Sequence, residues 1–208
     1  MLPQFTPRYV SIHGAGLGDC WASVNWCLNQ SDAVALHPVA LCGQDRTSLI
    51  LSIFRALAKT RALYLSSAPG PALSWREVYK APYLRVKKQW DPHHRVIACQ
   101  FHGKSKPRVT NCSSVEEKTF HEATRSFTVI NLDRIGTLDD GISALIRCEY
   151  FVGVDSGYAH VACSVGLPVF VIRNGRTSTN IHEESFPGKG VISFSNMAEF
   201  LSSGVIKQ

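Results

Sequence analysis

Two short motifs near opposite ends of the chain carry residues that could bind an anion and move a proton. The first is the glycine loop Gly14-Ala15-Gly16-Leu17-Gly18, which leads directly into Asp19. The second is Asp155-Ser156-Gly157, which ends an apolar run and is followed by His160. Glycines let a backbone approach a ligand closely, and the free N–H groups at a helix start favour phosphate. A carboxylate such as that of Asp19 can serve as a general base.

The glycine loop departs from both common nucleotide-binding patterns. A dinucleotide fingerprint would need glycine at position 19, and no acidic residue follows the second expected strand, which ends near His37. It is not a Walker loop either, because the full G-x-x-x-x-G-K-[ST] pattern does not occur in the chain. Two interpretations of Asp19 therefore stay open. Its carboxylate caps its own helix start, or it acts as a general base facing a cleft between domains.

The second motif follows a predicted buried strand, Tyr150–Val154. Open parallel sheets bind ligands at the carboxyl ends of their strands, which is where this strand delivers Asp155. Ser156 and Gly157 then begin a helix, and His160 on its first turn could reach the same anion. The simpler alternative is a strand–turn–helix with a capping aspartate and a surface histidine.

The elements that must position these motifs alternate between short apolar runs and amphipathic patterns, which is typical of a parallel α/β sheet. We expect strands at Tyr9–His13, Ala33–Leu36, Ala62–Leu65, Arg95–Phe101, Phe127–Leu132, Tyr150–Val154, Pro168–Ile172 and Val191–Phe194. We expect helices at Asp19–Leu28, Thr47–Ala58, from Val115, after an N-cap at Thr137, at Tyr158–Val165 up to Gly166, and near Ser195. A capping box, Ser114 with Glu117, is expected to begin the helix from Val115.

These elements predict two small Rossmann-like parallel-sheet domains, residues 1–92 and 93–208. The segment between Trp75 and Arg95 is the least regular part of the chain, and we place the junction there. Its basic and aromatic residues are either a solvated linker that packs the domain interface or a surface for a polyanion such as DNA or RNA.

Composition restricts the class of protein. With 208 residues, 45% of them hydrophobic and 18% charged, the chain can bury a core and is not disordered. No apolar run approaches the roughly 20 residues of a membrane span, and the start does not resemble a secretory signal. Seven cysteines without a C-x-x-C pair favour reduced thiols and a cytoplasmic location, and no spacing typical of a metal site is present. The net charge of +6 favours an anionic ligand.

Together, the two motifs resemble those of the heptosyltransferase-like glycosyltransferases, the ADP-heptose:lipopolysaccharide family. The family string D-S-G-x-x-H-x-A-x-x-x-G-x-P is matched in register by Asp155, Ser156, Gly157, His160, Ala162, Gly166 and Pro168. The family's opening G-x-G-D is similar to Gly16-Leu17-Gly18-Asp19. The resemblance covers about residues 9–28 and 136–175. The chain is shorter than members of this family usually are, mostly in its N-terminal half and between Lys106 and Phe127.

The resemblance implies a compact GT-B architecture with its active site between two domains, the acceptor on the first and the nucleotide sugar on the second. It makes Asp19 the base on the acceptor hydroxyl and assigns Asp155, Ser156, Gly157 and His160 to the donor. A lysine after the second domain's first strand would contact the donor phosphate, and both Lys104 and Lys106 fit. The implied reaction moves a hexose or heptose with inversion, without a metal or further cofactor.

Several alternatives stay open. The acceptor could be a glycan, a lipid-linked glycan or a nucleic acid, and the oligomeric state is undetermined. A nucleotide-sugar hydrolase or epimerase could share this architecture, and so could a non-catalytic nucleotide-binding module. A binding module has no need of an acceptor base, so Asp19 favours the transferase.

Overall fold

Parallel strands form one sheet in each of two units, Met1–Arg85 and Val86–Gln208, in the computed structural model. The structure describes residues 8–12, 14, 16–31, 33–57, 62–89, 95–103, 111–174, 186 and 190–206, with the backbone alone at residue 75. The predicted α/β class with two Rossmann-like parallel sheets is confirmed. The domain boundary predicted after residue 92 falls outside the described residues and stays a prediction.

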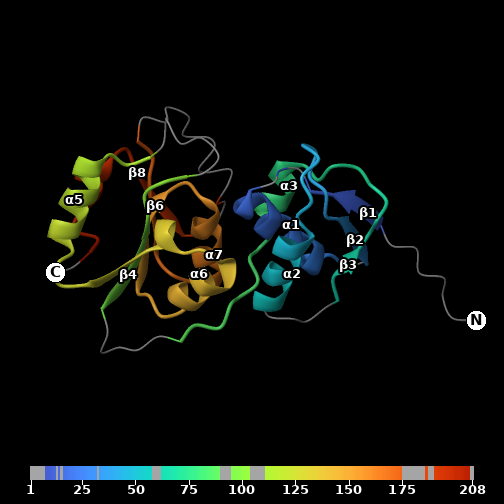
Figure 1. Ribbon diagram of the computed structural model, residues 1–208, viewed down its shortest axis with the longest axis horizontal. Coiled ribbons are helices and arrows are strands. Elements are labelled where there is room, and N and C mark those ends of the chain that lie inside the picture. The colour runs from blue at the N-terminus through green and yellow to red at the C-terminus, as the bar shows by residue number, and fades with distance from the viewer. Residues whose placement is uncertain are drawn as a thin grey trace, which may run out of the picture. The chain divides into compact units, whose positions relative to one another are not determined.

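The N-terminal unit contains a sheet of order β1-β2-β3. Its strands are β1 (Arg8–Ser11), β2 (Val34–His37) and β3 (Tyr64–Leu65), and its helices are α1 (Leu17–Asn29), α2 (Thr47–Ala56) and α3 (Trp75–Lys80). Figure 1 shows α1 and α2 on the same side of this sheet. The core includes Trp21 of α1 and Leu36 of β2, both fully buried. This packing fixes the start of α1 next to the carboxyl end of β1.

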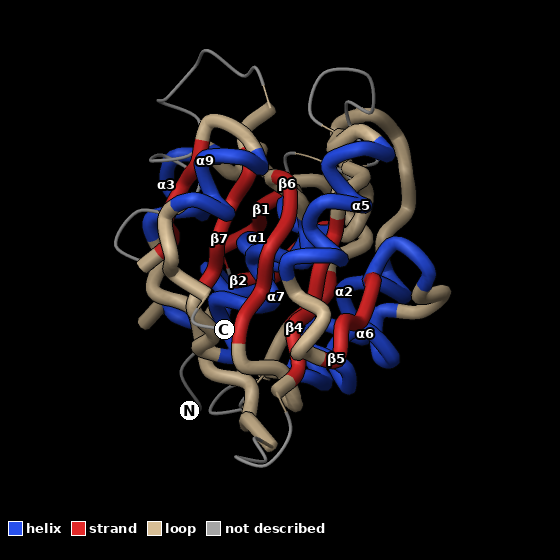
Figure 2. Tube along the Cα trace, turned by 90° about the vertical axis from the view of Figure 1, so that its left-hand side faces the viewer, coloured by secondary structure: helices blue, strands red, loops and turns tan. Residues whose placement is uncertain are grey.

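The C-terminal unit contains a sheet of order β5-β4-β6-β7-β8. Its strands are β4 (Val96–Gln100), β5 (Thr128–Asn131), β6 (Tyr150–Val154), β7 (Val169–Ile172) and β8 (Val191–Phe194). Its helices are α5 (Ser114–Ala123), the short 3₁₀ helix η1 (Leu132–Arg134), α6 (Leu138–Leu145), α7 (Gly157–Val165) and α9 (Met197–Ser202). Figure 1 shows α5 on one side of the sheet and α6 with α7 on the other, and Figure 2 shows β4, β6 and β7 side by side.

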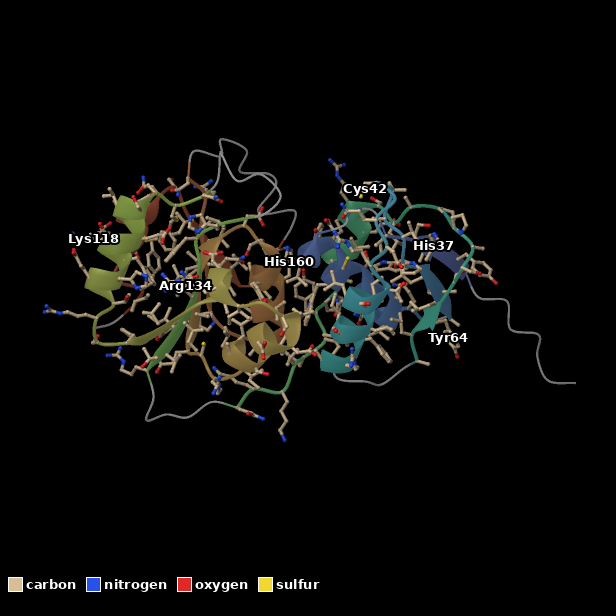
Figure 3. The ribbon with its side chains drawn as sticks, in the orientation of Figure 1. His37, Cys42, Tyr64, Lys118, Arg134 and His160 are labelled. Carbon is tan, nitrogen blue, oxygen red and sulfur yellow. The ribbon has the colours of Figure 1, made fainter. Side chains whose placement is uncertain are left out.

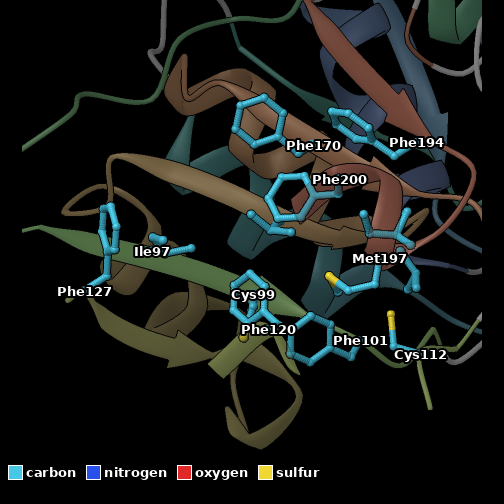
Figure 4. Close-up of a cluster of buried hydrophobic side chains, with 13 residues drawn as sticks. Ile97, Cys99, Phe101, Cys112, Phe120, Phe127, Phe170, Phe194, Met197 and Phe200 are labelled. Carbon is cyan, nitrogen blue, oxygen red and sulfur yellow. The ribbon is translucent and has the colours of Figure 1, made fainter. Parts of the chain in front are cut away.

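An aromatic core lies between this sheet and the helices α5 and α9. Phe120 of α5 and Phe200 of α9 stack with their ring centroids 6.4 Å apart, and Phe101 meets Phe120 edge to face at 5.1 Å (Figure 4). Alternate residues of β4, Ile97 and Cys99, belong to the same cluster. Because strand side chains alternate between faces, the other residues of β4 lie on the side of α6 and α7.

The order of strands reverses at β4 and β6. From β4 the chain continues to β5 at one edge of the sheet, and from β6 it continues to β7 in the opposite direction. Gln100, the last residue of β4, is paired with Gly153 of β6, where a Cβ would lie 2.3 Å from the backbone oxygen of Gln100. Only glycine permits this approach. Doubly wound sheets bind ligands outside the carboxyl ends of the strands at such a reversal.

Local sequence signals set several of the predicted boundaries. Thr137 caps α6 by accepting a hydrogen bond from the Asp140 N–H, and α7 ends at Gly166, so both predictions are confirmed. The capping box predicted at Ser114 is wrong by one residue, since Ser113 and Glu116 form it. In the sequence SSVEE either serine has a glutamate three residues later, so either could begin a capping box. The first one does, and the helix begins one residue earlier than expected.

The prediction of an irregular segment from residue 75 is also wrong at its start, where α3 forms. This helix is short, and Val78 and Tyr79 are buried in the N-terminal unit. The helix α1 contributes Asn25, which donates a hydrogen bond to the Pro82 oxygen (2.7 Å) and accepts one from the Leu84 N–H (2.6 Å). Tertiary contacts rather than periodicity therefore order this part of the chain.

The seven cysteines are all free, as predicted, and all except Cys42 are buried. Among the described residues, none of the helices combines the length and apolar character that a membrane span needs.

Candidate functional site

The structure places Asp155, Ser156 and Gly157 together at the carboxyl end of β6 and the start of α7. Ser156 is the N-cap residue of α7, yet its side chain makes no capping bond. The other α-helices of this unit in the described part of the chain, α5, α6 and α9, each receive a side-chain cap, from Ser113, Thr137 and Asn196. Ser156 thus caps none of the first N–H groups of α7, which is an arrangement that suits a bound anion.

Buried polar atoms without a partner concentrate at the same edge of the sheet. Within the described residues there are four such side-chain atoms, and three of them, Gln100 Oε1, Ser156 Oγ and Arg173 Nε, belong to the carboxyl ends of β4, β6 and β7. The fourth, Arg46 Nε, lies in the N-terminal unit. Because folded proteins rarely leave buried polar atoms unpaired, this edge is suited to a polar ligand.

His160 lies on α7 (Figure 3), and its side chain is almost fully buried, with 3% exposure. Its ring stacks on Phe186 with the centroids 4.4 Å apart. The alternative of a surface histidine is therefore wrong. The assignment of His160 to the donor stays a prediction.

A histidine that the sequence analysis did not single out follows directly after β4. The His102 ring has its Nδ1 3.1 Å from Asp133 Oδ2 and its Nε2 3.2 Å from Glu117 Oε1. The same Asp133 oxygen accepts the backbone N–H groups of Phe101 (2.9 Å) and His102 (3.2 Å). These bonds tie the residues after β4 to the end of β5, so the backbone at this edge is held in one conformation.

Lys104 and Lys106 lie outside the described residues, but the chain on either side of them is held at the same edge. The Gly103 N–H donates to Asn111 Oδ1 (2.8 Å), and the Cys112 N–H donates to the Phe101 oxygen (3.0 Å). Asn174, after β7, donates to the Asn111 oxygen (3.2 Å). Both ends of the connection that carries the two lysines therefore adjoin β4.

In the N-terminal unit, Asp19 lies in the first turn of α1 and accepts a hydrogen bond from the Tyr79 hydroxyl (2.9 Å). The bond described for this carboxylate thus comes from α3, not from the backbone of its own helix. A Cβ on Gly14 would lie 2.3 Å from Asp19 Oδ2, so a larger residue there would displace the carboxylate from its present position. Gly16 is the N-cap residue of α1, and Gly18 is buried in its first turn.

The charge of Asp19 affects a neighbouring thiol. Burial raises the pKa of Cys20 to about 12, the negative charge of Asp19 adds to this effect, and the positive charge of Arg46 opposes it. Arg46 comes directly before α2. Sequence reasoning missed both Arg46 and Tyr79, because neither is close to Asp19 in the chain.

Solved structures of a bacterial glycosyltransferase share this fold. One is TibC, an iron-containing dodecameric glycosyltransferase from enterotoxigenic E. coli H10407, with a TM-score of 0.51 and 14% identity over 80% of this chain and 57% of TibC. Another is the dodecameric iron-containing heptosyltransferase TibC in complex with ADP-D-beta-D-heptose, with a TM-score of 0.54 and 12% identity over 90% of this chain and 62% of TibC. At these identities the similarity shows the fold alone.

The chain spans about three-fifths of the length of TibC. No protein-family model and no curated protein sequence matches it. TibC contains iron, whereas the described part of this chain has no group of three or more His, Cys, Asp or Glu residues that could hold a metal ion. The described residues thus do not fit such a centre.

Proposed function

We propose that the chain is a glycosyltransferase of GT-B type that moves a sugar from a nucleotide-diphosphate donor to an acceptor hydroxyl. One observation carries the proposal. In a fold similar to that of TibC, the Asp155-Ser156-Gly157 motif lies at the strand reversal and begins a helix whose start has no side-chain cap. A structure of TibC holds ADP-D-beta-D-heptose, which supports a nucleotide sugar as the ligand here and a heptose or hexose as the sugar.

In this proposal the donor diphosphate binds at the start of α7. The Ser156 hydroxyl and the first N–H groups of α7 donate to the phosphate oxygens. His160 and one of the two lysines, Lys104 or Lys106, add positive charge. These groups stabilise the nucleoside diphosphate as it leaves, so the proposed reaction needs no metal ion.

Asp19 supplies the base. The Tyr79 hydroxyl occupies Oδ1 of its carboxylate, and Oδ2, on the side of Gly14, is the oxygen that removes the acceptor proton. The acceptor oxygen then attacks the anomeric carbon from the face opposite the nucleotide. The bond to the diphosphate breaks as the new glycosidic bond forms, and the configuration is inverted.

The proposed acceptor is a glycan or lipid-linked glycan bound by the N-terminal unit, with a nucleic acid as the rival that competition binding would identify. A reducing compartment such as the cytoplasm suits the seven free thiols.

Nucleotide release tests the proposal. The purified chain is incubated with ADP-, UDP- and GDP-sugars, with and without a panel of glycan, lipid-linked glycan and nucleic-acid acceptors. Release that requires an acceptor supports a transferase. Release without an acceptor identifies a hydrolase, and a thermal shift without turnover identifies a binding module, so either result overturns the proposal.

A further inference from the structure

Gln100 has a buried side-chain oxygen that the fold leaves without a hydrogen-bond donor. The residue is 8% exposed, and its Nε2 donates to the His102 backbone oxygen at 3.3 Å. Among the described residues, no donor reaches its Oε1. Exchanging the two amide atoms would set an oxygen against the His102 oxygen, so the hydrogen bond itself fixes which atom is unpaired.

The position of Gln100 connects this oxygen to the proposed donor site. Ile97 and Cys99 of β4 face the core under α5, and Gln100 therefore lies on the opposite face, the side of α6 and α7. Its partner in β6 is Gly153, which places no side chain beside it. Three residues after Gly153, Ser156 begins α7 with its own buried and unpaired hydroxyl.

An unpaired amide oxygen needs a donor from the ligand. The diphosphate oxygens of a nucleotide sugar accept hydrogen bonds at neutral pH and cannot supply one, whereas a sugar hydroxyl can. We infer that Gln100 binds a hydroxyl group of the nucleotide sugar, either on the ribose or on the transferred sugar, and so selects ligands that carry a sugar next to the phosphates. The inference rests on the proposed function, because it places the ligand at the same edge of the sheet.

The variant Gln100→Met tests the inference, because methionine keeps the length of the side chain and removes the amide with its unpaired oxygen. Binding of inorganic pyrophosphate, ADP, the 2′,3′-dideoxy form of ADP, and ADP-glucose is measured by calorimetry with wild type and variant. We expect pyrophosphate binding to stay within about twofold and ADP-glucose binding to weaken about tenfold, which equals about 1.4 kcal/mol. Weakened ADP binding with unchanged dideoxy-ADP binding identifies a ribose hydroxyl. A loss confined to ADP-glucose identifies the transferred sugar.

The matched control is Gln89→Met, which makes the same exchange at an exposed position of the C-terminal unit. Thermal unfolding separates a ligand contact from a structural role. The variant loses the unpaired oxygen and also the Nε2 that donates to the His102 oxygen, and because these two changes oppose each other its melting temperature should stay close to that of wild type. Equal weakening of pyrophosphate and ADP-glucose binding, whether or not the melting temperature falls, would show that Gln100 does not act through a sugar hydroxyl and would overturn the inference.

The two proposals fail in different ways. If wild type binds pyrophosphate and ADP-glucose, and Gln100→Met binds every probe equally well, the inference is overturned and the proposed function stands. If Gln100→Met weakens the binding of ADP and of its dideoxy form equally, a ribose hydroxyl is excluded. The inference is then overturned unless the binding of ADP-glucose is weakened further. If wild type binds neither pyrophosphate nor any ADP-, UDP- or GDP-sugar, the proposed function is overturned and the inference with it.

Discussion

The hydrogen bond from Tyr79 gives Asp19 a defined orientation at the start of α1. The tyrosine hydroxyl donates to Oδ1, while Oδ2 lies next to Gly14, which has no side chain. A carboxylate held in this way can accept a proton without first losing a bond to its own helix. The contact therefore favours the interpretation of Asp19 as a base over that of a cap.

Asp19→Asn should separate these two roles. The amide keeps the shape of the side chain and can still accept from Tyr79, so the melting temperature should hardly change. Turnover should fall by about 10²–10⁴-fold, which is the usual contribution of a positioned base. Donor affinity, measured by calorimetry on the same preparation, should stay as in wild type.

Asp139→Asn is the matched control for this variant, because Asp139 is an exposed aspartate in the first turn of α6. Its turnover should equal that of wild type. If Asp19→Asn also turns over at the wild-type rate, Asp19 is not the base, and the proposed mechanism is wrong.

The stacked His160 ring calls for a substitution that keeps its packing. His160→Phe retains an aromatic ring against Phe186 and removes both ring nitrogens. Donor affinity should fall roughly 10- to 150-fold, which corresponds to about 1.5–3 kcal/mol for a hydrogen bond to a charged group. Calorimetry with the donor found in the nucleotide-release assay measures this, and His121→Phe on α5 is the control. Unchanged affinity in His160→Phe would remove the residue from the donor site.

At the scale of elements, the starts of the α-helices in the described part of the C-terminal unit are of two kinds. The starts of α5, α6 and α9 are satisfied by their own side chains, whereas that of α7 has no side-chain cap. Side-chain capping stabilises a helix, and an uncapped start leaves its N–H groups to a ligand. The proposed function uses the one α-helix of this set whose start the fold does not cap.

Two adjacent serines allow a direct test of the capping assignment on α5. Ser113→Ala removes the side-chain oxygen that accepts the Glu116 N–H and should lower the free energy of unfolding by about 1 kcal/mol. Ser114→Ala, one residue further and already inside the helix, should change it by less than about 0.5 kcal/mol. Urea unfolding measures both. A larger loss of stability in Ser114→Ala than in Ser113→Ala would instead support the capping box of Ser114 and Glu117 that the sequence suggests.

At the scale of the whole molecule, buried thiols link stability to alkaline pH. Burial raises the pKa of Cys148 to about 12, with the nearby charges of Arg147 and Lys88 acting in the opposite direction. Burial has the same effect on Cys27 and Cys112, and the pKa of each is about 12. Since an unfolded thiol ionises near pH 9, the unfolded state gains stability first as the pH rises.

The free energy of unfolding should therefore be fully retained below about pH 9 and decline from there toward pH 12. Each of these three thiols contributes up to about 1.4 kcal/mol for every pH unit in this window. Cys148→Ala should reduce the slope of this decline in urea unfolding between pH 8.5 and 10.5. Cys42→Ala should leave it unchanged, because Cys42 is exposed. Equal slopes in wild type and Cys148→Ala would contradict the assignment.

The sequence by itself determined the features that depend on neighbours a few residues away. Alternating apolar runs predict the parallel strands, Thr137 caps α6 as its spacing to Asp140 indicates, and Gly166 ends α7. The motif after β6 was also recognisable, because an apolar strand followed by Asp155-Ser156-Gly157 is a local pattern. Where two neighbouring residues could both cap a helix, as Ser113 and Ser114 could, only the structure shows which of them does.

Only the tertiary structure decided which distant residues meet and which polar atoms remain unpaired. Tyr79 reaches Asp19 because α3 packs on α1, and Asp133 holds the end of β4 because β5 lies beside it. The unpaired oxygen of Gln100 and the burial of His160 depend in the same way on which elements surround them. Propensity and capping act over a few residues, whereas burial and hydrogen-bond satisfaction depend on segments brought together from far apart in the chain.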